Sequence, residues 1–554
     1  MIRIPGRCKG LAVCLALILL LCCAGAALAD AAPEGYPEVR PGVDFGGKDL
    51  YIYTFWDPGD YWGEYDAKSE HTDYEEATHA WREWIQETYH VRIREAARGN
   101  WNDGHLEMIR FAYEGGEEDK YALFYIQSGR IRDVAFAGAA APIGYDLSDV
   151  KWNRGDTAMA TFGGKVYGTH AGTSEPRQCL FFNKRVLTEA GVDWNALYDA
   201  QANGTWTWKM LEDVLSQVKD SDKTEAAGII GSTDDLYKIA VLSAGGAFIT
   251  TDENGAFIPA VDSEETKAAL SWARDLWYNY SAERPADAFW NWADTLWGEG
   301  GAAFFVAQSY TGFSQGGTGF DQYGLRDEWG CLAFPTPEEN GTYVTPVTDT
   351  VIMVPSCYDE ETVNNMMLIY DLWTSETPGY PLRNSWEDSL SGMKDRRAVQ
   401  ETYAMLADPE HQVADLSGLF GDVNGLLGPA LFWSMSADAD IPALTAGAAE
   451  RMAFDCQSFG SVPEPGAFAA VFQDGWNPGE DYRILIRPVE GAAYRVTVER
   501  DGTLCFEDGA ARPIEYILPP DAFPESGSYV VTCSAEADGI TGSASALFYT
   551  DIPQ

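Results

Sequence analysis

Nine residues scattered along the chain carry side chains that could hold a small polar solute without covalent chemistry. They combine aromatic and imidazole rings with amide, hydroxyl and carboxylate groups: Trp56, Asp57, Gln127, Ser128, Tyr167, His170, Trp292, Asp349 and Trp386. Flat rings with a polar edge suit the face of a sugar, but they fill protein cores equally well. Asp57 and Asp349 could instead form turns or helix caps, and His170 could be structural.

Motifs for other chemistry are missing from the sequence. The six histidines form no HExxH or HxxxH pair. Segment 220–225 begins like a calcium loop, but Glu225 stands where such a loop needs glycine. The sequence contains neither a phosphate-binding loop nor a GxSxG nucleophile motif. We therefore expect no metal ion, no cofactor and no catalytic residue.

Two alternatives to solute binding stay open at this stage. Segment 56–64 places three acidic residues beside three aromatic ones. Glycoside cleavage needs a pair of carboxyl groups, so a secreted glycoside-active enzyme is one alternative. However, the chain has 85 acidic residues, so chance alone puts some of them beside tryptophan. The other alternative is an envelope-attached adhesion or sensory protein, in which the C-terminal part makes the contacts.

The charge balance excludes one large class of partners. The 554 residues include 85 acidic and 38 basic side chains, which gives a formal net charge of −47. Such a chain repels phosphate backbones, so we expect no nucleic-acid partner. The hydrophobic content of 46% is enough for ordinary cores, and the length allows several domains. We expect a monomer.

The first 29 residues have the pattern of a signal peptide. Basic residues precede an apolar run at 11–23, and the small-x-small triplet 27–29 offers a cleavage site. An exported, extracellular or envelope-associated protein is therefore expected. A lipid anchor at Cys22 or Cys23 is an alternative, but Leu21 stands where lipoprotein processing needs a small residue.

The N-terminal half alternates between strand and helix patterns. Apolar runs at 50–56, 91–96 and 121–126 predict strands, and amphipathic segments between them predict helices. This alternation predicts a parallel sheet with helices on both faces. Ligands bind beyond the carboxyl ends of parallel strands, so we expect the pairs 56–57 and 127–128 to line the site.

The stretch from 163 to 219 is the most specific part of the sequence. It reads GGKVYGTH at 163–170, CLFFNK at 179–184 and VLTEAG at 186–191, followed by TWTW at 205–208. Strand, short capped helix, glycine stop and a second capped helix are predicted in that order.

This order of motifs resembles the carbohydrate-type extracellular solute-binding proteins (family 1) that serve ABC importers. Two positions depart from the family pattern: His170 stands where proline is common, and Met210 replaces an acidic residue in the helix cap. The resemblance implies a two-lobed α/β periplasmic-binding-protein-like (type II) fold with a hinge and an interlobe cleft. It also implies a carbohydrate ligand, closure around that ligand, and delivery to a membrane permease.

Beyond a linker at 460–466 the sequence pattern changes from mixed helix and strand signals to strand signals alone. Short strand-like runs separated by turn signals predict a small β-sandwich of immunoglobulin or fibronectin type. Cys505 and Cys533 are the most plausible disulfide pair, although free thiols are equally expected. The expected division is signal peptide 1–29, tether 30–45, lobe 1 about 46–162 and 286–340, lobe 2 about 163–285 and 341–460, and β-sandwich 461–554.

Overall fold

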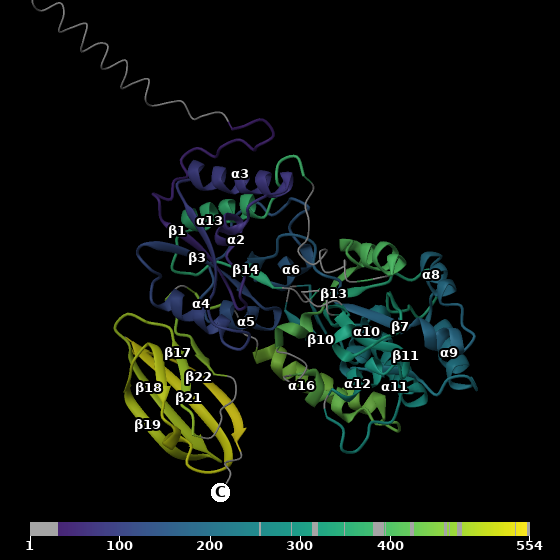
Figure 1. Cartoon of the computed structure of the whole chain (residues 1–554). Helices are drawn as coiled ribbons and strands as arrows, with labels where there is room; N and C mark the ends of the chain where they lie inside the picture. Colours follow the sequence, from purple (N-terminus) through teal and green to yellow (C-terminus); the bar gives the residue numbers. More distant parts are fainter. Residues whose placement is uncertain are drawn as a thin grey trace, which may run out of the picture.

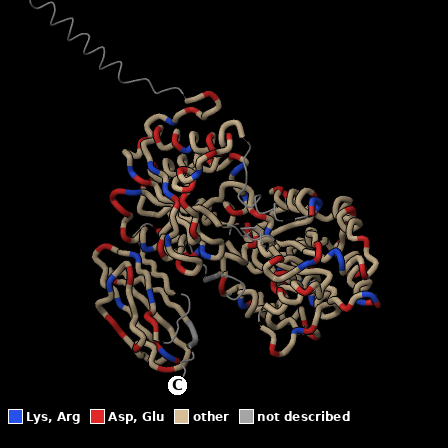
Figure 2. Tube along the Cα trace, viewed as in Figure 1, with Lys and Arg blue, Asp and Glu red and all other residues tan. Residues whose placement is uncertain are grey.

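The computed structural model shows two α/β lobes and a C-terminal β-sandwich (Figure 1). It describes residues 32–253, 256–289, 291–312, 319–347, 350–380, 393, 395–420, 426–458, 462–464, 466–473, 479–537 and 539–550. Figure 2 shows acidic residues distributed over both lobes and the sandwich. Within the described residues, no helix combines the length and the apolar character that crossing a membrane requires.

The first sheet forms the centre of lobe 1. Its strand order is β2 (Arg92–Ala97), β1 (Asp49–Thr54), β3 (Lys120–Ile126), β14 (Val351–Met353) and β6 (Gly168–Thr169). β1 runs parallel to β2 and β3, as the alternation in the sequence predicts, whereas β14 runs antiparallel to β3 and β6.

Helices cover both faces of this sheet. Successive side chains along β3 point to opposite sides, so neighbouring residues of this strand pack against different helices. Leu123 packs with helices α3 (Asp73–Thr88) and α13 (Glu360–Trp373). Phe124 packs with α4 (Gly104–Tyr113) and α5 (Ile131–Phe136) on the other face. The short helix α2 (Tyr61–Ala67) follows β1, and α6 (Arg154–Met159) precedes the crossing to lobe 2.

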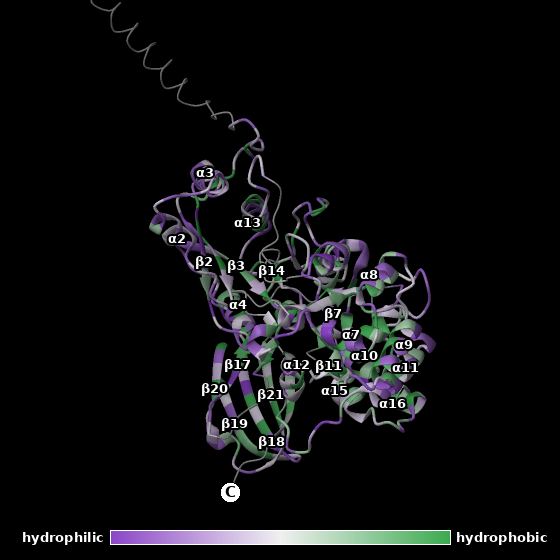
Figure 3. Ribbon diagram, turned by 45° about the vertical axis from the view of Figure 1, so that its right-hand side comes forward, coloured by the Kyte–Doolittle hydropathy of each residue, from purple (hydrophilic) through white to green (hydrophobic). Residues whose placement is uncertain are grey.

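The second sheet forms the centre of lobe 2. Its strand order is β12 (Trp329–Leu332), β7 (Gln178–Asn183), β11 (Ala302–Gln308) and β8 (Ala227–Gly231). Its helices include α7 (Lys184–Glu189), α8 (Trp194–Ala202), α9 (Trp208–Lys219), α10 (Thr233–Ser243), α11 (Glu264–Tyr280), α12 (Trp292–Gly298) and α16 (Ile441–Ser458). Helix α9 is amphipathic, and Figure 3 shows both hydrophilic and hydrophobic residues along it.

The predicted caps of lobe 2 are present. The Asn183 side chain accepts from the Val186 amide at 3.1 Å and begins α7, and Gly191 follows it with a positive φ of 81°. Thr207 accepts from the Met210 amide at 3.4 Å at the start of α9.

The predicted assignment of segments to lobes is wrong in part. β11 and β12 belong to lobe 2, because Phe304 lies opposite Phe182 and Cys331 lies opposite Phe181 in the ladders with β7. Conversely, β14 and α13 belong to lobe 1. A short buried run does not reveal from its own sequence which sheet it will join, since backbone pairing with a distant strand decides this.

The expected tether packs on lobe 1 over the part that the structure describes. The Tyr36 ring lies 5.0 Å from that of Trp81 and 5.1 Å from that of Trp84, both on α3. Phe45 is buried, and the Arg40 amide donates to the Tyr89 hydroxyl at 3.2 Å. Residues 1–31, including the predicted signal peptide, lie outside the described residues.

A small two-stranded sheet lies between the lobes. β13 (Thr345–Val347) pairs in parallel with β15 (Gln412–Ala414), and it contacts α10 of lobe 2 while β15 contacts α6 of lobe 1. The Thr345 hydroxyl accepts from the amides of Arg177 and Gln178 at 2.9 and 3.0 Å, which anchors the crossing from β6 to β7.

The C-terminal strands form an all-β sandwich. One sheet contains β16 (Ala470–Phe472), β17 (Tyr482–Ile486) and β20 (Ile514–Leu518); the other contains β19 (Thr503–Ala511), β18 (Ala493–Arg500), β21 (Gly527–Ala537) and β22 (Ile540–Thr550). The expected disulfide is not formed: Cys533 is buried in the sandwich core, Cys505 is exposed, and both are free thiols.

The sandwich packs on lobe 1 through the outer face of β17. Tyr482 and Ile484 point into the sandwich core, whereas Leu485, which is 1% exposed, belongs to the core cluster around α4 and α5. Glu515 of β20 lies 2.9 Å from Arg483 and 3.8 Å from Arg110 of α4. Figure 1 shows the sandwich beside α4 and α5, away from most of lobe 2.

Candidate functional site

The carboxyl ends of the lobe 1 strands meet at one edge of the first sheet. β1, β2 and β3 are parallel, and β6 shares their direction because both β3 and β6 run antiparallel to β14. Trp56, Gln127 and His170 each follow one of these strands. The structure therefore brings these three predicted residues to a common edge.

Two exposed tryptophans flank a phenylalanine on this edge, and we call Phe55, Trp56 and Trp101 the aromatic ridge. The Phe55 ring lies 4.8 Å from Trp56 and 5.3 Å from Trp101. Trp56 is 40% exposed and Trp101 is 62% exposed. Gln127 supports the ridge, because its side-chain amide donates to the Trp101 carbonyl at 2.6 Å. The ridge offers apolar ring surface to a solute at the edge of the sheet.

The polar neighbours of the ridge mostly have structural partners. Asp57 accepts from the Gly59 amide at 3.0 Å, so it closes a turn, as the structural alternative predicts. Ser128 begins the 3-10 turn η1 (Ser128–Arg130), directly after Gln127. His170 Nδ1 lies 2.9 Å from the Thr350 carbonyl oxygen, at the beginning of the crossing to lobe 2.

The corresponding edge of lobe 2 also gathers strand ends. β8 and β11 are parallel and β7 is antiparallel to β11, so the carboxyl ends of β8 and β11 lie beside the amino end of β7. Tyr310, which is 49% exposed, follows β11, and the Arg177 guanidinium lies 5.9 Å from its ring. The Ser309 hydroxyl donates to Glu175 at 2.9 Å, and the side-chain amide of Gln178 donates to Asp235 at 2.7 Å.

Several titratable groups at this edge are partly desolvated. Burial, and next the charge of Asp235, raises the pKa of the Tyr310 hydroxyl. Burial raises the pKa of Asp294, and burial together with Asp235 raises the pKa of Asp234. Trp292 stands two residues before Asp294 at the start of α12 and packs half-buried against the lobe 2 core. The wall formed by lobe 2 is therefore aromatic and acidic.

The two edges adjoin the same crossing segment. Residues 170–177 connect the end of β6 in lobe 1 to the start of β7 in lobe 2. Both edges therefore lie at the two ends of one short connection, beside the small sheet of β13 and β15. We call the region between the aromatic ridge and Tyr310 the interlobe site.

One of the predicted site residues lies in a core, and two lie outside the described residues. Tyr167 is 5% exposed and packs in the lobe 1 core, where its ring lies 6.2 Å from Phe162. The prediction of a ligand contact is wrong for Tyr167, because its side chain is buried in this core. Asp349 and Trp386 lie outside the described residues.

The sequence analysis missed Trp101 and Tyr310. Trp101 follows β2, and the rule that loops after parallel strands line the site would have selected it. Tyr310 follows β11, which the sequence analysis placed in lobe 1, so its loop was assigned to the wrong edge. Within the described residues, no group of histidine, cysteine, aspartate and glutamate side chains could hold a metal ion.

Comparison with known proteins identifies the fold. No family model and no curated protein matches the sequence. Among solved structures, the chain is similar to the cyclic alpha-maltosyl-1,6-maltose binding protein from Arthrobacter globiformis, with a TM-score of 0.51 and 16% identity over 74% of this chain and 99% of that one.

Two other solved structures align over the same share of this chain. They are the GacH receptor of Streptomyces glaucescens, with TM-score 0.46, 16% identity and 100% of its length covered, and an ABC transporter solute-binding protein from Thermotoga lettingae, with TM-score 0.45, 14% identity and 99% covered. The sheet order, the paired edges and the Arthrobacter alignment together show that the chain has the two-lobed fold of a solute-binding protein, to which a β-sandwich is added.

Proposed function

We propose that this protein captures a carbohydrate, most simply an oligosaccharide, between its two lobes and delivers it to the permease of an ABC transporter outside the cytoplasm. The observation that carries the proposal is the exposed aromatic ridge at the carboxyl edge of lobe 1. Tyr310 follows β11 at the edge of lobe 2, and residues 170–177 connect the two edges. The Arthrobacter neighbour with this fold binds cyclic alpha-maltosyl-1,6-maltose, which is a sugar.

Closure of the two lobes would supply the signal for delivery. A sugar that contacts the ridge and Tyr310 together binds the closed form more tightly than the open form. It therefore shifts the population toward closure, and the size of the shift equals this difference in affinity. Stacking and hydrogen bonding are sufficient for this task, and no bond of the sugar needs to break.

The local geometry favours binding over hydrolysis at the ridge. A glycosidase needs two available carboxyl groups on either side of the bond that it cleaves. Beside the ridge, Asp57 closes a turn, and Asp60 caps α2 by accepting from the Gly63 amide at 3.1 Å. Two of the three acidic residues in segment 56–64 therefore serve the backbone, and the third, Glu64, lies on α2.

The first prediction concerns the two exposed tryptophans of the ridge. Trp56→Ala and Trp101→Ala should each weaken sugar binding by about 10- to 100-fold, because each removes ring surface worth roughly 1–3 kcal/mol from the contact. Binding is measured by thermal shift and titration calorimetry across mono- and oligosaccharides. Trp194→Ala is the matched control, since Trp194 lies over Lys184 at the opposite end of β7.

Three outcomes would contradict the proposal. The wild-type protein binds none of the saccharides, the control weakens binding as much as the ridge variants do, or incubation with oligosaccharides releases reducing ends. The last result would establish the enzymatic alternative.

A further inference from the structure

The first turn of α12 places Asp294 at the lobe 2 edge of the interlobe site. The Trp297 ring of α12 stacks on Phe305 of β11 at 5.2 Å, and the short segment 299–301 connects the helix to that strand. The helix therefore runs back along β11, and its first turn lies toward the carboxyl end of the strand. Tyr310 follows this end, so Asp294 and Tyr310 belong to the same edge.

A second tyrosine joins Asp294 and Tyr310 at this edge. Both α12 and the 3-10 turn η2 (Ser309–Thr311) contact the 3-10 turn η3 (Gly319–Tyr323). Burial raises the pKa of Tyr323 to about 12, and the charges of Asp294 and Tyr310 contribute to this shift. Tyr310 is 49% exposed, so a solute can reach its ring. The lobe 2 wall therefore combines one carboxylate with two phenol rings.

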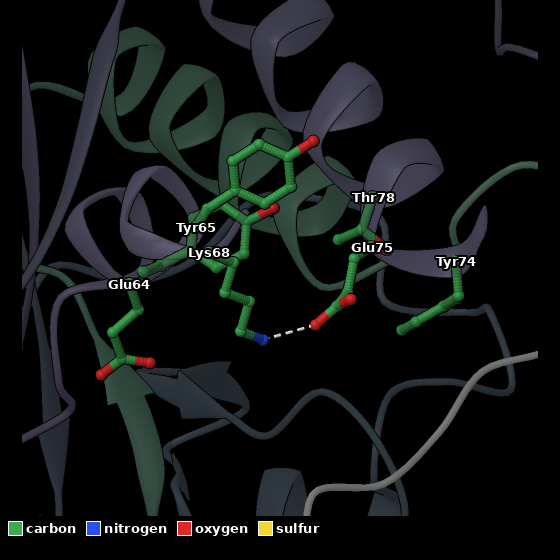
Figure 4. A pocket seen from close by; sticks show the side chains of 7 residues that line it. Glu64, Tyr65, Lys68, Tyr74, Glu75 and Thr78 are labelled. Atoms are coloured by element: carbon green, nitrogen blue, oxygen red, sulfur yellow. Dashed lines mark hydrogen bonds and ion pairs between the residues drawn. The ribbon is translucent and has the colours of Figure 1, made fainter. Parts of the chain in front are cut away.

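Asp294 carries a charge that no described residue balances. Burial alone raises its pKa, and no neighbouring cation lowers it. The chain has 85 acidic and 38 basic residues, so many carboxylates must lack a cation, but such groups normally stay in water. Figure 4 shows both ordinary cases, since Lys68 Nζ lies 2.5 Å from Glu75 whereas Glu64 is exposed. Asp294 is instead partly buried, so it loses hydration without gaining a partner.

The charges around Tyr310 favour a cation over an anion. Three carboxylates and one guanidinium act on its hydroxyl, namely those of Asp235, Asp294, Glu175 and Arg177. Arg177 lies 3.5 Å from Glu175 and 5.9 Å from the Tyr310 ring, so the cation of this wall is already engaged. An anionic group would meet the excess of carboxylates, whereas an ammonium group is attracted both to a carboxylate and to the face of an aromatic ring.

We propose that Asp294 is a specificity-determining residue of the interlobe site and selects an oligosaccharide that carries a protonated amino group. The ammonium group donates to the Asp294 carboxylate and lies near the Tyr310 ring, while the aromatic ridge contacts the face of the sugar. A sugar that carries a carboxyl, sulfate or phosphate group is repelled. The inference rests on the proposed function and specifies its substrate class.

The test compares three ligand series that differ in one substituent. Oligomers of glucosamine, N-acetylglucosamine and glucose, with the same β-1,4 linkage and from dimer to hexamer, carry an ammonium, an acetamide or a hydroxyl group at the second carbon. Titration calorimetry at about pH 6 keeps the amine protonated, since free amines of this kind titrate near pH 8. The glucosamine series should bind at least about 10-fold more tightly than the glucose series, and high salt should reduce this advantage.

Asp294→Asn keeps the shape of the side chain and removes its charge. It should reduce the advantage of the glucosamine series to less than about 3-fold and change the affinity for the glucose series by less than about 2-fold. Asp213→Asn is the matched control, because Asp213 is an exposed acidic residue on α9 and its loss changes the net charge of lobe 2 equally. It should leave the preference for glucosamine unchanged.

Three results would overturn the role of Asp294 and leave the proposed function standing. The three series bind equally well, Asp294→Asn weakens all of them by the same factor, or Asp213→Asn removes the preference as fully as Asp294→Asn does. Failure of the wild-type protein to bind any member of the three series overturns the inference too. Failure in the full saccharide screen overturns the proposed function as well.

Discussion

His105 is a buried histidine that the fold keeps neutral. It lies near the start of α4, is 7% exposed, and its Nδ1 has no hydrogen-bond partner among the described residues. Burial, and next the charge of Arg130, lowers its pKa from 6.5 to about 3. In the unfolded chain the imidazole takes up a proton below pH 6.5, whereas in the fold it stays neutral down to about pH 3. Stability is therefore lost as the pH falls through this window.

His105→Gln should make the protein less sensitive to acid. Between pH 6.5 and 4.5 the wild-type protein should lose about 2–3 kcal/mol more unfolding free energy than the variant, since two pH units correspond to about 2.7 kcal/mol per proton. Urea unfolding at both pH values measures the difference. Equal acid sensitivity of the two proteins would show that His105 is not held neutral by the fold.

The residues of the interlobe site show what single positions reveal in a sequence. The positions of Trp56 and Gln127 at the sheet edge could be predicted, because Trp56 ends and Gln127 directly follows an apolar run that is typical of a parallel strand. Asp57 matched the same rule, yet it closes a turn. Tyr167 could not be distinguished from a ligand contact, since a tyrosine in a short strand has the same local sequence whether its ring faces the core or the solvent.

A buried ion pair connects an element of lobe 2 to one that packs on lobe 1. Lys238 of α10 lies 3.0 Å from Asp415, which precedes the 3-10 turn η7 (Leu416–Phe420). Leu419 of η7 packs in the lobe 1 core. Burial alone would lower the pKa of Lys238, but Asp415 and the two acids at the start of α10 raise it. Burial would raise the pKa of Asp415, but Lys238 and Ser417 lower it.

Lys238→Met should destabilise the protein by about 3–5 kcal/mol, because it leaves the carboxylate of Asp415 buried without its cation. The double variant Lys238→Met/Asp415→Asn should recover most of this loss, since neither charge then remains. Urea unfolding at neutral pH measures all three proteins. If the double variant were no more stable than the single one, packing of the lysine stem and not its charge would be responsible.

Local signals in the sequence predicted which helices and strands form, but they did not predict which strands pair with one another. The three parallel strands of lobe 1 and the caps at Asn183 and Thr207 depend on residues close together in the chain. The position of β11 depends on its ladder with β7, more than a hundred residues earlier, and both candidate sheets would accept an equally apolar strand.

The whole molecule consists of two lobes and a sandwich that packs on one of them. Leu485→Glu places a charge in the contact with lobe 1 but not in the sandwich core, so it should separate the sandwich from the lobe. Small-angle X-ray scattering should show a larger radius of gyration, and sugar binding should stay within about 2-fold of wild type, because the contact involves α4 and not the aromatic ridge.

Leu504→Glu is the control for this experiment, since Leu504 lies on β19 and is already 51% exposed. It should leave the radius of gyration unchanged. An unchanged radius in Leu485→Glu as well would mean that the ion pairs of Glu515 hold the sandwich in place without the apolar contact.

The packing of Leu485 in the lobe 1 core fixes the orientation of the sandwich relative to lobe 1. Because the sandwich packs on lobe 1, anything that holds the sandwich also holds lobe 1 in a fixed orientation. Under the proposed function, lobe 2 is then the part that moves when the lobes close. A surface that holds this protein by its C-terminal sandwich would present every copy with lobe 1 fixed and lobe 2 moving. Under the proposed function, capture of a sugar would then change the position of lobe 2 relative to that surface and leave lobe 1 in place.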